Sequence, residues 1–248
     1  MKGKRTVLSR FFGTGCQQGV DARLPPPNIA SMLEQIIGKK SFPISGSALR
    51  ELAAPYGAFH ADLGTGDGMF VYRHARAQAD VFYLGVDADR SSLAESSAKA
   101  AKKPARGGAA NAAFVCFNLL DVPEDMTGIA DHVFVNFPWG SLMYAWVEPN
   151  IEAIRSMAAI GKKGADFSFY LNLYVFQNEE QRQHMNLPDV DEAYVTGTLI
   201  PAYEKAGITI HNHAFLDALE LKDHPSTWAG RLIRRSGRET LYMTGKIG

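Results

Sequence analysis

Cysteine is scarce in this sequence, and its two cysteines, Cys16 and Cys116, fit neither a disulfide framework nor a metal-ligand spacing. His211 and His213 lie two apart in a strand-like pattern, without the cysteines or carboxylates that would complete a metal site. We therefore expect a cytoplasmic protein that works in a reducing compartment and binds no metal.

Long apolar runs and an excess of either charge are also missing. No apolar run is long enough to span a bilayer, and the basic start of the chain is not followed by the apolar segment of a signal peptide. The 26 basic residues equal the 26 acidic residues, so net charge gives no argument for a nucleic-acid partner. Such a partner has to be inferred from local basic clusters.

Residues 1–31 lack any hydrophobic period. Glycines and three successive prolines at residues 25–27 interrupt this segment, so we expect an extension that is poorly ordered or lies on the surface. The remainder alternates strand-like and helix-like segments, which is typical of an α/β fold with a parallel sheet.

The clearest motif is a strand-like run that enters a glycine-rich turn, DLGTGDG at residues 62–68. Gly64 and Gly66 let the backbone approach a ligand closely. A second strand ends at Asp87, about 20 residues further on, where nucleotide-binding folds place an acid on ribose hydroxyls.

The glycine spacing is G-x-G-x-G, which differs from the dinucleotide pattern G-x-G-x-x-G. With no pyrophosphate to accommodate, Asp62 can instead meet an ammonium group. The combination favours S-adenosylmethionine over NAD, and a purely structural turn is the alternative.

Two further strand ends complete the expected ligand edge. A strand over residues 113–117 leads to Leu119, against which an adenine ring would lie. A strand over residues 131–135 leads to the segment NFPWG, in which Pro138 restricts Phe137 to extended geometry. Aromatics on a strand-end turn suit ligand contact, and a hydrophobic plug under a loop is the alternative.

Flanking segments give a coarse outline of the other elements. We expect a short strand over residues 38–42, a helix capped by Ser45 or Ser47, a strand from Phe167 to Val175, and a helix that Asp191 starts and that ends near residue 207. Strands from residue 208 and over residues 240–246 close the chain.

Two basic clusters stand beside these elements. The first, at a predicted helix end, consists of Lys99, Lys102, Lys103 and Arg106. It is either a phosphate contact patch or a solvated helix terminus that the macrodipole favours. The second follows Trp228 and consists of Arg231, Arg234, Arg235 and Arg238. Tryptophan with arginine is typical of nucleic-acid sites, and a buried tryptophan under an amphipathic turn is the alternative.

Four motifs in this order resemble the 16S ribosomal RNA adenine-N1 methyltransferases that confer aminoglycoside resistance. They are DLGTGDG (residues 62–68), KKPARGG (102–108), FPWGSL (137–142) and STWAGRL (226–232). The likeness begins at about residue 37. It implies a single methyltransferase domain over residues 37–248, with residues 1–36 as an extension and an insertion at about residues 176–190.

The resemblance implies a class I S-adenosylmethionine-dependent methyltransferase fold. This is a Rossmann-like, seven-stranded, mostly parallel sheet whose last strand is antiparallel, with helices on both faces and an N-terminal β-hairpin. It also implies the small ribosomal subunit, through its 16S rRNA decoding site, as the partner, and we expect a monomer without membrane attachment.

The resemblance further implies roles for individual residues. Trp139 and Trp228 match the tryptophans that sandwich the flipped adenine, beside Phe137 and Pro138, whose backbone can orient the base. Cofactor contacts are implied for Asp62, Gly64, Gly66, Asp87, Leu119, Leu120, Asn136, Ser141 and Ser226. Ribosomal RNA contacts are implied for Lys99, Lys102, Lys103 and Arg106, and expected for Arg182 and the second basic cluster.

Several positions depart from the family enzyme that aligns most readily. That enzyme has an acid at Leu120, an apolar residue at Asn136, a basic residue at Met185, an acid at Asn178 and an arginine at Ser236. Arg182 is the nearest substitute for the basic residue at Met185. These departures bear on cofactor and RNA affinity more than on the fold.

Adenine N1 carries a lone pair and no proton at neutral pH, so methyl transfer needs alignment and no general base. Three other functions remain open. An N6-adenine methyltransferase has an Asn-Pro-Pro-Phe/Tyr motif similar to residues 136–139; a tRNA guanine-N7 methyltransferase is a weaker alternative. The third is a non-catalytic RNA-binding relative.

Overall fold

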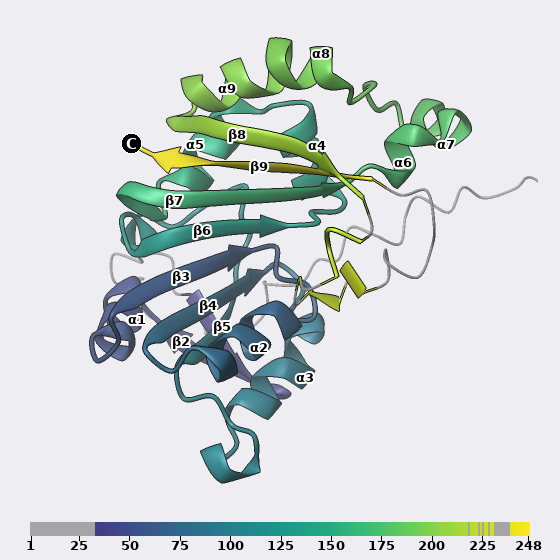
Figure 1. Ribbon diagram of the computed structural model, residues 1–248. Coiled ribbons are helices and arrows are strands. Elements are labelled where there is room, and N and C mark those ends of the chain that lie inside the picture. The colour runs from purple at the N-terminus through teal and green to yellow at the C-terminus, as the bar shows by residue number, and fades with distance from the viewer. Residues whose placement is uncertain (1–32, 218, 223, 225, 228, 231–238) are drawn as a thin grey trace, which may run out of the picture.

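The computed structural model describes residues 33–217, 219–222, 224, 226, 227, 229, 230 and 239–248. In these residues, strands form one sheet with helices on both faces (Figure 1). The strands are β1 (Leu33–Ile37), β2 (Lys40–Ile44), β3 (Ala58–Leu63), β4 (Val81–Asp87), β5 (Ala112–Cys116), β6 (Ala130–Asn136), β7 (Gly161–Asn172), β8 (Ile208–Leu216) and β9 (Thr240–Ile247).

The α-helices are α1 (Gly46–Ala53), α2 (Met69–Ala77), α3 (Arg90–Ala100), α4 (Ser141–Val147), α5 (Ile151–Ala158), α6 (Tyr174–Gln177), α7 (Glu179–His184), α8 (Glu192–Tyr194) and α9 (Ile200–Lys205). Short 3-10 helices are η2 (Pro104–Arg106) and η3 (Glu124–Met126), and η4 (Val195–Leu199) is a π-helix.

The strand order is β2-β1-β5-β4-β3-β6-β7-β9-β8. From β5 to β7 the neighbouring strands are parallel, and β9 is antiparallel to both β7 and β8. The strands β3 to β9 thus form the expected mostly parallel sheet with one reversed strand, and the β1–β2 hairpin extends it beside β5. The arrowheads of β3, β4, β6 and β7 point to one edge, and that of β9 points away (Figure 1). The predicted fold is confirmed.

Apolar side chains fill both faces of the sheet. On one face, Val71 of α2 and Leu93 of α3 are fully buried against β4 and β5. On the other face, Leu49 of α1, Trp146 of α4 and Tyr203 of α9 are fully buried in a larger cluster. Among the described residues, no helix is long and apolar enough to cross a membrane.

Polar side chains mark several helix starts, as the sequence predicts. Ser45 caps α1 by accepting a hydrogen bond from the Ala48 amide. Asp191 caps α8 by accepting from the Tyr194 amide, and the helical segment continues through η4 and α9 to Lys205. The predicted starts at Ser45 and Asp191 are confirmed.

Two predicted strands have different bounds. Gly38 lies in the hairpin turn, with φ of +63°, so the single strand expected over residues 38–42 is wrong. The strand expected from Phe167 to Val175 starts earlier and ends at Asn172, whose side chain accepts a hydrogen bond from the Tyr174 amide. This local turn starts α6 and redirects the chain.

Parts of the two segments expected to lie outside the core domain, the extension over residues 1–36 and the insertion at about residues 176–190, pack against it. The sheet begins at Leu33, which is 1% exposed, so the hairpin reaches into the segment assigned to the extension. In the segment expected to be an insertion, Leu187 is buried and the Tyr144 hydroxyl donates to the Met185 carbonyl. These contacts pack residues 185–187 onto α4.

Candidate functional site

A cavity of about 410 Å³ opens where the carboxyl ends of β3, β4 and β6 meet. This volume lies in the range of small-molecule and cofactor sites. All nine residues predicted to contact a cofactor line it: Asp62, Gly64, Gly66, Asp87, Leu119, Leu120, Asn136, Ser141 and Ser226. Phe137 and Trp139 line it as well.

The glycine turn forms the floor of this cavity. The amides of Gly64 and Thr65 both donate to the Val86 carbonyl, which ties the turn to the end of β4. Gly64 has a φ of +75°, and a Cβ placed there would lie 2.4 Å from Leu142 Cδ2. The positive φ therefore favours glycine at this position, and any other side chain would also make Leu142 shift.

Asp87 closes the turn from the next strand. Its Oδ2 accepts from the Gly66 amide at 2.8 Å, and its Oδ1 accepts from the Asp89 amide at 2.9 Å. Burial raises the pKa of this carboxyl, and the two amides oppose the shift. Each carboxylate oxygen has a second lone pair, so Asp87 can still accept hydrogen bonds from ligand hydroxyls.

Asp62 and Asn136 form a buried pair at the ends of β3 and β6. Asp62 is in register with Phe134, so Asn136, two residues further on, lies on the same face. Asn136 Nδ2 donates to Asp62 Oδ1 at 2.9 Å. Asp62 and Asn136 are only 1% and 7% exposed.

Burial raises the pKa of Asp62 to about 7, and the neighbouring Asp87 and Asp67 add to the shift. The Asn136 amide and the Thr65 hydroxyl oppose it. Asp62 Oδ2 and Thr65 Oγ1 nevertheless meet no hydrogen-bond geometry with any described residue. Asp62 lines the cavity, and a buried carboxyl oxygen that lacks a donor suits a cationic ligand group.

Leu119 and Leu120 follow β5 and form an apolar wall. Leu119 is buried, and Leu120 is 39% exposed. The Asn118 side chain accepts from the Leu120 amide at 3.0 Å, which holds the turn in shape. An apolar wall beside the acid that faces ribose hydroxyls is suited to a flat heterocycle.

Phe137 differs from its predicted conformation. Its φ is +53°, in the left-handed region, so the expectation that Pro138 holds it extended is wrong. The Phe137 amide donates to the Tyr170 carbonyl at 2.7 Å, and its buried ring packs on Tyr170 and His224. These tertiary contacts offset a backbone strain of about 1–3 kcal/mol.

The strained turn buries Pro138 and turns Trp139 outward, where it is 52% exposed. Trp139 lines both the 410 Å³ cavity and a second, more open one of about 770 Å³. The second cavity is also lined by Asn172, Tyr174 and Met185. An exposed indole between two cavities can stack on a base that enters beside the first cavity.

Two described residues between β8 and β9, Ser226 and Thr227, reach the same cavity. Ser226 is buried and its hydroxyl accepts from the Ala229 amide at 3.0 Å, and Thr227 lines the cavity beside it. The predicted site residues Trp228, Arg231, Arg234, Arg235 and Arg238 lie outside the described residues.

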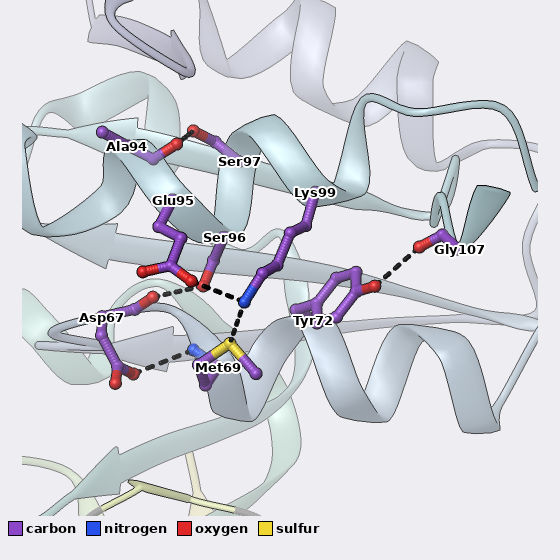
Figure 2. Close-up of polar contacts among 9 residues, drawn as sticks. All are labelled: Asp67, Met69, Tyr72, Ala94, Glu95, Ser96, Ser97, Lys99 and Gly107. Atoms are coloured by element: carbon purple, nitrogen blue, oxygen red, sulfur yellow. Dashed lines mark hydrogen bonds and ion pairs between the residues drawn. The ribbon is translucent and has the colours of Figure 1, made fainter.

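The first basic cluster begins in the last turn of α3 with Lys99, which Figure 2 shows, and continues after the helix. Lys99 pairs with Glu95 at 2.7 Å and lies 3.8 Å from the Met69 sulfur. Lys102, Lys103 and Arg106 are exposed and form no ion pair with any described residue. The Tyr72 hydroxyl donates to the Gly107 carbonyl at 2.7 Å and holds this loop on α2.

Arg182 occupies a different environment. Its guanidinium pairs with Asp189 at 2.9 Å, and its side chain is 24% exposed. The structure thus places this arginine in a local ion pair on α7, away from the α3 cluster.

Sequence reasoning assigned no role to several residues that line the cavity, among them Thr65, Asp67, Phe70 and Leu142. Thr65 lies between Gly64 and Gly66, which were predicted to contact the cofactor, so its place at the cavity could have been predicted from the sequence. Leu142 had only its place in the FPWGSL motif, whereas Thr227 lies beside the predicted Ser226 and also lines the cavity. Within the described residues, no group of histidine, cysteine and carboxylate side chains is arranged to hold a metal ion.

Comparison with known proteins agrees with this architecture. The family model described as NpmA: 16S rRNA (adenine(1408)-N(1))-methyltransferase matches residues 34–247. The 16S rRNA (adenine(1408)-N(1))-methyltransferase of Escherichia coli is 31% identical over 211 residues, covering 85% of this chain and 96% of that protein. The enzyme of the same name from Streptoalloteichus tenebrarius is 31% identical, covering 87% of this chain and 99% of that protein.

Solved structures are similar too. The 16S rRNA methyltransferase KamB matches with a TM-score of 0.76 and 30% identity, covering 87% of this chain and 99% of that one. The 16S rRNA (adenine(1408)-N(1))-methyltransferase from Catenulisporales acidiphilia matches with a TM-score of 0.77 and 26% identity, covering 86% of this chain and 98% of that one. A mutant of that enzyme was solved with cosubstrate SAM. The chain described here belongs to the 16S rRNA (adenine(1408)-N(1))-methyltransferase family.

Proposed function

We propose that this protein transfers a methyl group from S-adenosyl-L-methionine to N1 of adenine 1408 in 16S rRNA, and thereby confers aminoglycoside resistance. The observation that carries the proposal is the position of Trp139. This exposed indole stands in the wall of the cavity that Asp62 and Asp87 line. One edge of the sheet thus combines a cofactor-sized cavity with a stacking surface for a base.

The residues of the cavity fit S-adenosylmethionine. Asp62 Oδ2 is a buried acceptor without a partner among the described residues, as a site for the cofactor's ammonium group requires. Asp87 is suited to the ribose hydroxyls, and Leu119 with Leu120 to the adenine ring. When bound, S-adenosylmethionine supplies an electrophilic methyl group on its sulfonium.

The protein's part in the chemistry is alignment. The attacking N1 of adenine has a free lone pair at neutral pH, so no residue has to remove a proton. Holding the base in line with the methyl group can lower the barrier by up to about 7–11 kcal/mol. Trp139 positions the base, and we assign Trp228 as its partner. Phe137 and Pro138 shape the turn that carries Trp139.

Stacking also compensates for extracting the base. Flipping an adenine out of its helix costs a few kcal/mol, and each stacked aromatic ring returns about 1–3 kcal/mol. The product, N1-methyladenine, is cationic, and the π face of an indole stabilises a cation. The same side chain therefore favours both the bound base and the charge that develops on it.

The RNA-binding surface is assigned to the exposed cations at the end of α3. Lys102, Lys103 and Arg106 have no local carboxylate partner among the described residues, so their charges are available to phosphates. Lys99 is paired with Glu95 and contributes less. We also assign the second basic cluster and Arg182 to this surface, with Arg182 weakened by Asp189.

An N6-adenine methyltransferase is the main alternative, because Asn136 begins a motif similar to the one that such enzymes use. Here the Asn136 amide donates a hydrogen bond to Asp62, on the cofactor side of Trp139. The Asn136 side chain is buried, with the residue 7% exposed. This arrangement favours a role of Asn136 in cofactor binding over a contact with the exocyclic amine of the target adenine. Primer extension on methylated 30S subunits separates the two products, since N1 methylation stops the polymerase and N6 methylation does not.

A further inference from the structure

Asp62 and Asn136 each keep one buried oxygen without a hydrogen-bond partner among the described residues. These oxygens are Asp62 Oδ2 and Asn136 Oδ1, and both residues line the 410 Å³ cavity. Buried acceptors that lack donors destabilise a fold. Two of them on side chains that are hydrogen-bonded to each other indicate a ligand that brings more than one donor.

The pairing between the two side chains fixes which atoms remain for that ligand. An ionised carboxylate can only accept hydrogen bonds, so the Asn136 amide must direct Nδ2 to Asp62 Oδ1, at 2.9 Å. Asn136 Oδ1 is then left as an acceptor. A primary ammonium group has three N–H donors and can satisfy both remaining oxygens.

The charges around the pair also favour a cation. Asp67 from the glycine turn and Asp87 from β4 both act on Asp62 as like charges. The neighbours that oppose them, Thr65 and Asn136, are neutral. The pair is therefore stabilised by a bound positive charge.

We propose that Asn136 is a positioning residue that orients the Asp62 carboxylate and supplies the second acceptor of an ammonium site. This inference rests on the proposed use of S-adenosylmethionine. It assigns to Asn136 a function that an apolar side chain at this position cannot perform.

The proposal has a pH signature. Burial and like charges raise the pKa of Asp62 to about 7, so below that pH the cofactor has to displace a proton. Affinity should fall by up to about tenfold for each pH unit below 7. It should also fall above about pH 8, where a free α-amino group loses its proton. Asn136 holds the pKa of Asp62 down, so removing its amide should move the acidic limb to higher pH.

The test is calorimetric titration of the full-length protein from pH 5.5 to 9 with two probes. S-adenosylmethionine carries the amino group, and 5′-methylthioadenosine lacks the entire amino-acid part. Asn136→Leu should weaken S-adenosylmethionine binding by about tenfold at pH 7 and shift the acidic limb upward. Binding of 5′-methylthioadenosine should change by less than about twofold. In wild type at pH 6.5, buffers of different ionisation enthalpy should reveal release of most of one proton.

Ser168→Ala is the matched control. Ser168 is a buried polar residue on β7 that bonds His132 at 2.9 Å and does not line the cavity, so its variant should keep the wild-type pH profile. Asn136→Ser is measured alongside, in case Asn136→Leu does not fold, and should show the same upward shift. Equal loss for both probes, or a loss without a pH shift, would overturn the proposal.

The outcomes separate this inference from the proposed function. A protein that shows the predicted pH profile but does not methylate 16S rRNA supports the inference and contradicts the function. A protein that methylates adenine 1408 but binds S-adenosylmethionine with the same pH profile in Asn136→Leu contradicts only the inference. A wild-type protein that does not bind S-adenosylmethionine contradicts both.

Discussion

Asn136 Nδ2 lies 2.9 Å from Asp62 Oδ1 and joins the ends of two neighbouring parallel strands inside the protein. Asn136 is also the last residue of β6, directly before the turn that carries Trp139. A single strand end therefore connects the side chain that orients Asp62 with the indole that faces the incoming base. Such a rigid link suits a reaction that depends on alignment.

Replacing Asp62 by asparagine should separate stability from binding. Burial raises the pKa of Asp62 from 3.8 to about 7 in the folded protein, so the folded state binds this proton more tightly than the unfolded chain. The contribution of Asp62 to the free energy of unfolding therefore falls as the pH rises from about 3.8 to 7. Asp62→Asn carries no charge to bury, so the ligand-free variant should be about 1–3 kcal/mol more stable than wild type at pH 8. Calorimetry should find no S-adenosylmethionine binding.

Thermal unfolding at pH 5 and pH 8 checks the first half of this prediction. The stability difference between variant and wild type should grow with pH. A difference that is the same at both pH values would show that Asp62 does not carry a raised pKa.

Trp139→Ala should slow methylation by about 5–150-fold while leaving cofactor binding within about threefold of wild type. The indole is 52% exposed and its removal leaves no buried hole, whereas a stacked base loses about 1–3 kcal/mol. Single-turnover methylation of 30S subunits and calorimetry measure the two effects. Trp139→Phe retains a stacking ring and should recover part of the activity; full activity in Trp139→Ala would exclude the stacking role.

The strand–turn–helix that holds Asp62, Gly64 and Asp87 could be predicted from the sequence because its signals are local. Gly64 has a backbone angle that residues with a side chain rarely adopt. The hydrogen bond between Asp62 and Asn136 could not be predicted, since it depends on β3 lying beside β6 and on their register. A single sequence gives neither.

The conformation of Phe137 was out of reach for the same reason. The local preference before a proline is extended, and the prediction followed it. In the structure, the hydrogen bond to the Tyr170 carbonyl and the packing on His224 override that preference. Both contacts come from residues far along the chain.

Removing the exposed cations at the end of α3 should weaken RNA binding without affecting the cofactor. Lys102→Ala, Lys103→Ala and Arg106→Ala combined should lower 30S affinity by about 10–100-fold at 0.1 M salt and reduce the slope of log affinity against log salt by about 2–3. Filter binding at several salt concentrations measures both quantities.

Lys163→Ala is the matched control. Lys163 is an exposed cation near the start of β7, which three strands separate from β5 in the sheet, so its variant should keep the wild-type salt slope. If the triple variant kept the wild-type slope of log affinity against log salt, the end of α3 would not be part of the RNA-binding surface.

Acid should destabilise the protein through its buried histidines. Burial lowers the pKa of His132 and of His224 from 6.5 to about 4. The unfolded chain binds protons at these sites before the folded one does, so the free energy of unfolding falls as pH decreases from about 6.5 to 4. Each histidine should contribute about 2 kcal/mol to that fall by pH 4.5.

The matched comparison is His224→Asn against wild type. As the pH falls below 7, protonation of Asp62 raises the free energy of unfolding and so opposes the effect of the histidines. Asp62 is present in both proteins, so the difference between their pH-dependent stability losses reports on His224 alone. Urea unfolding at pH 7 and pH 4.5 should find a smaller stability loss in the variant. The same loss in both proteins would mean that His224 titrates normally.

Primer extension through the decoding site tests the central claim most directly. Purified 30S subunits are incubated with the full-length protein and S-adenosylmethionine, with Trp139→Ala as the control. We expect a strong stop one nucleotide before adenine 1408 with the wild-type protein, a much weaker stop with the variant at equal reaction time, and no stop without the cofactor. Incorporation of the methyl group into 16S rRNA without a stop at this adenine would contradict the proposed function.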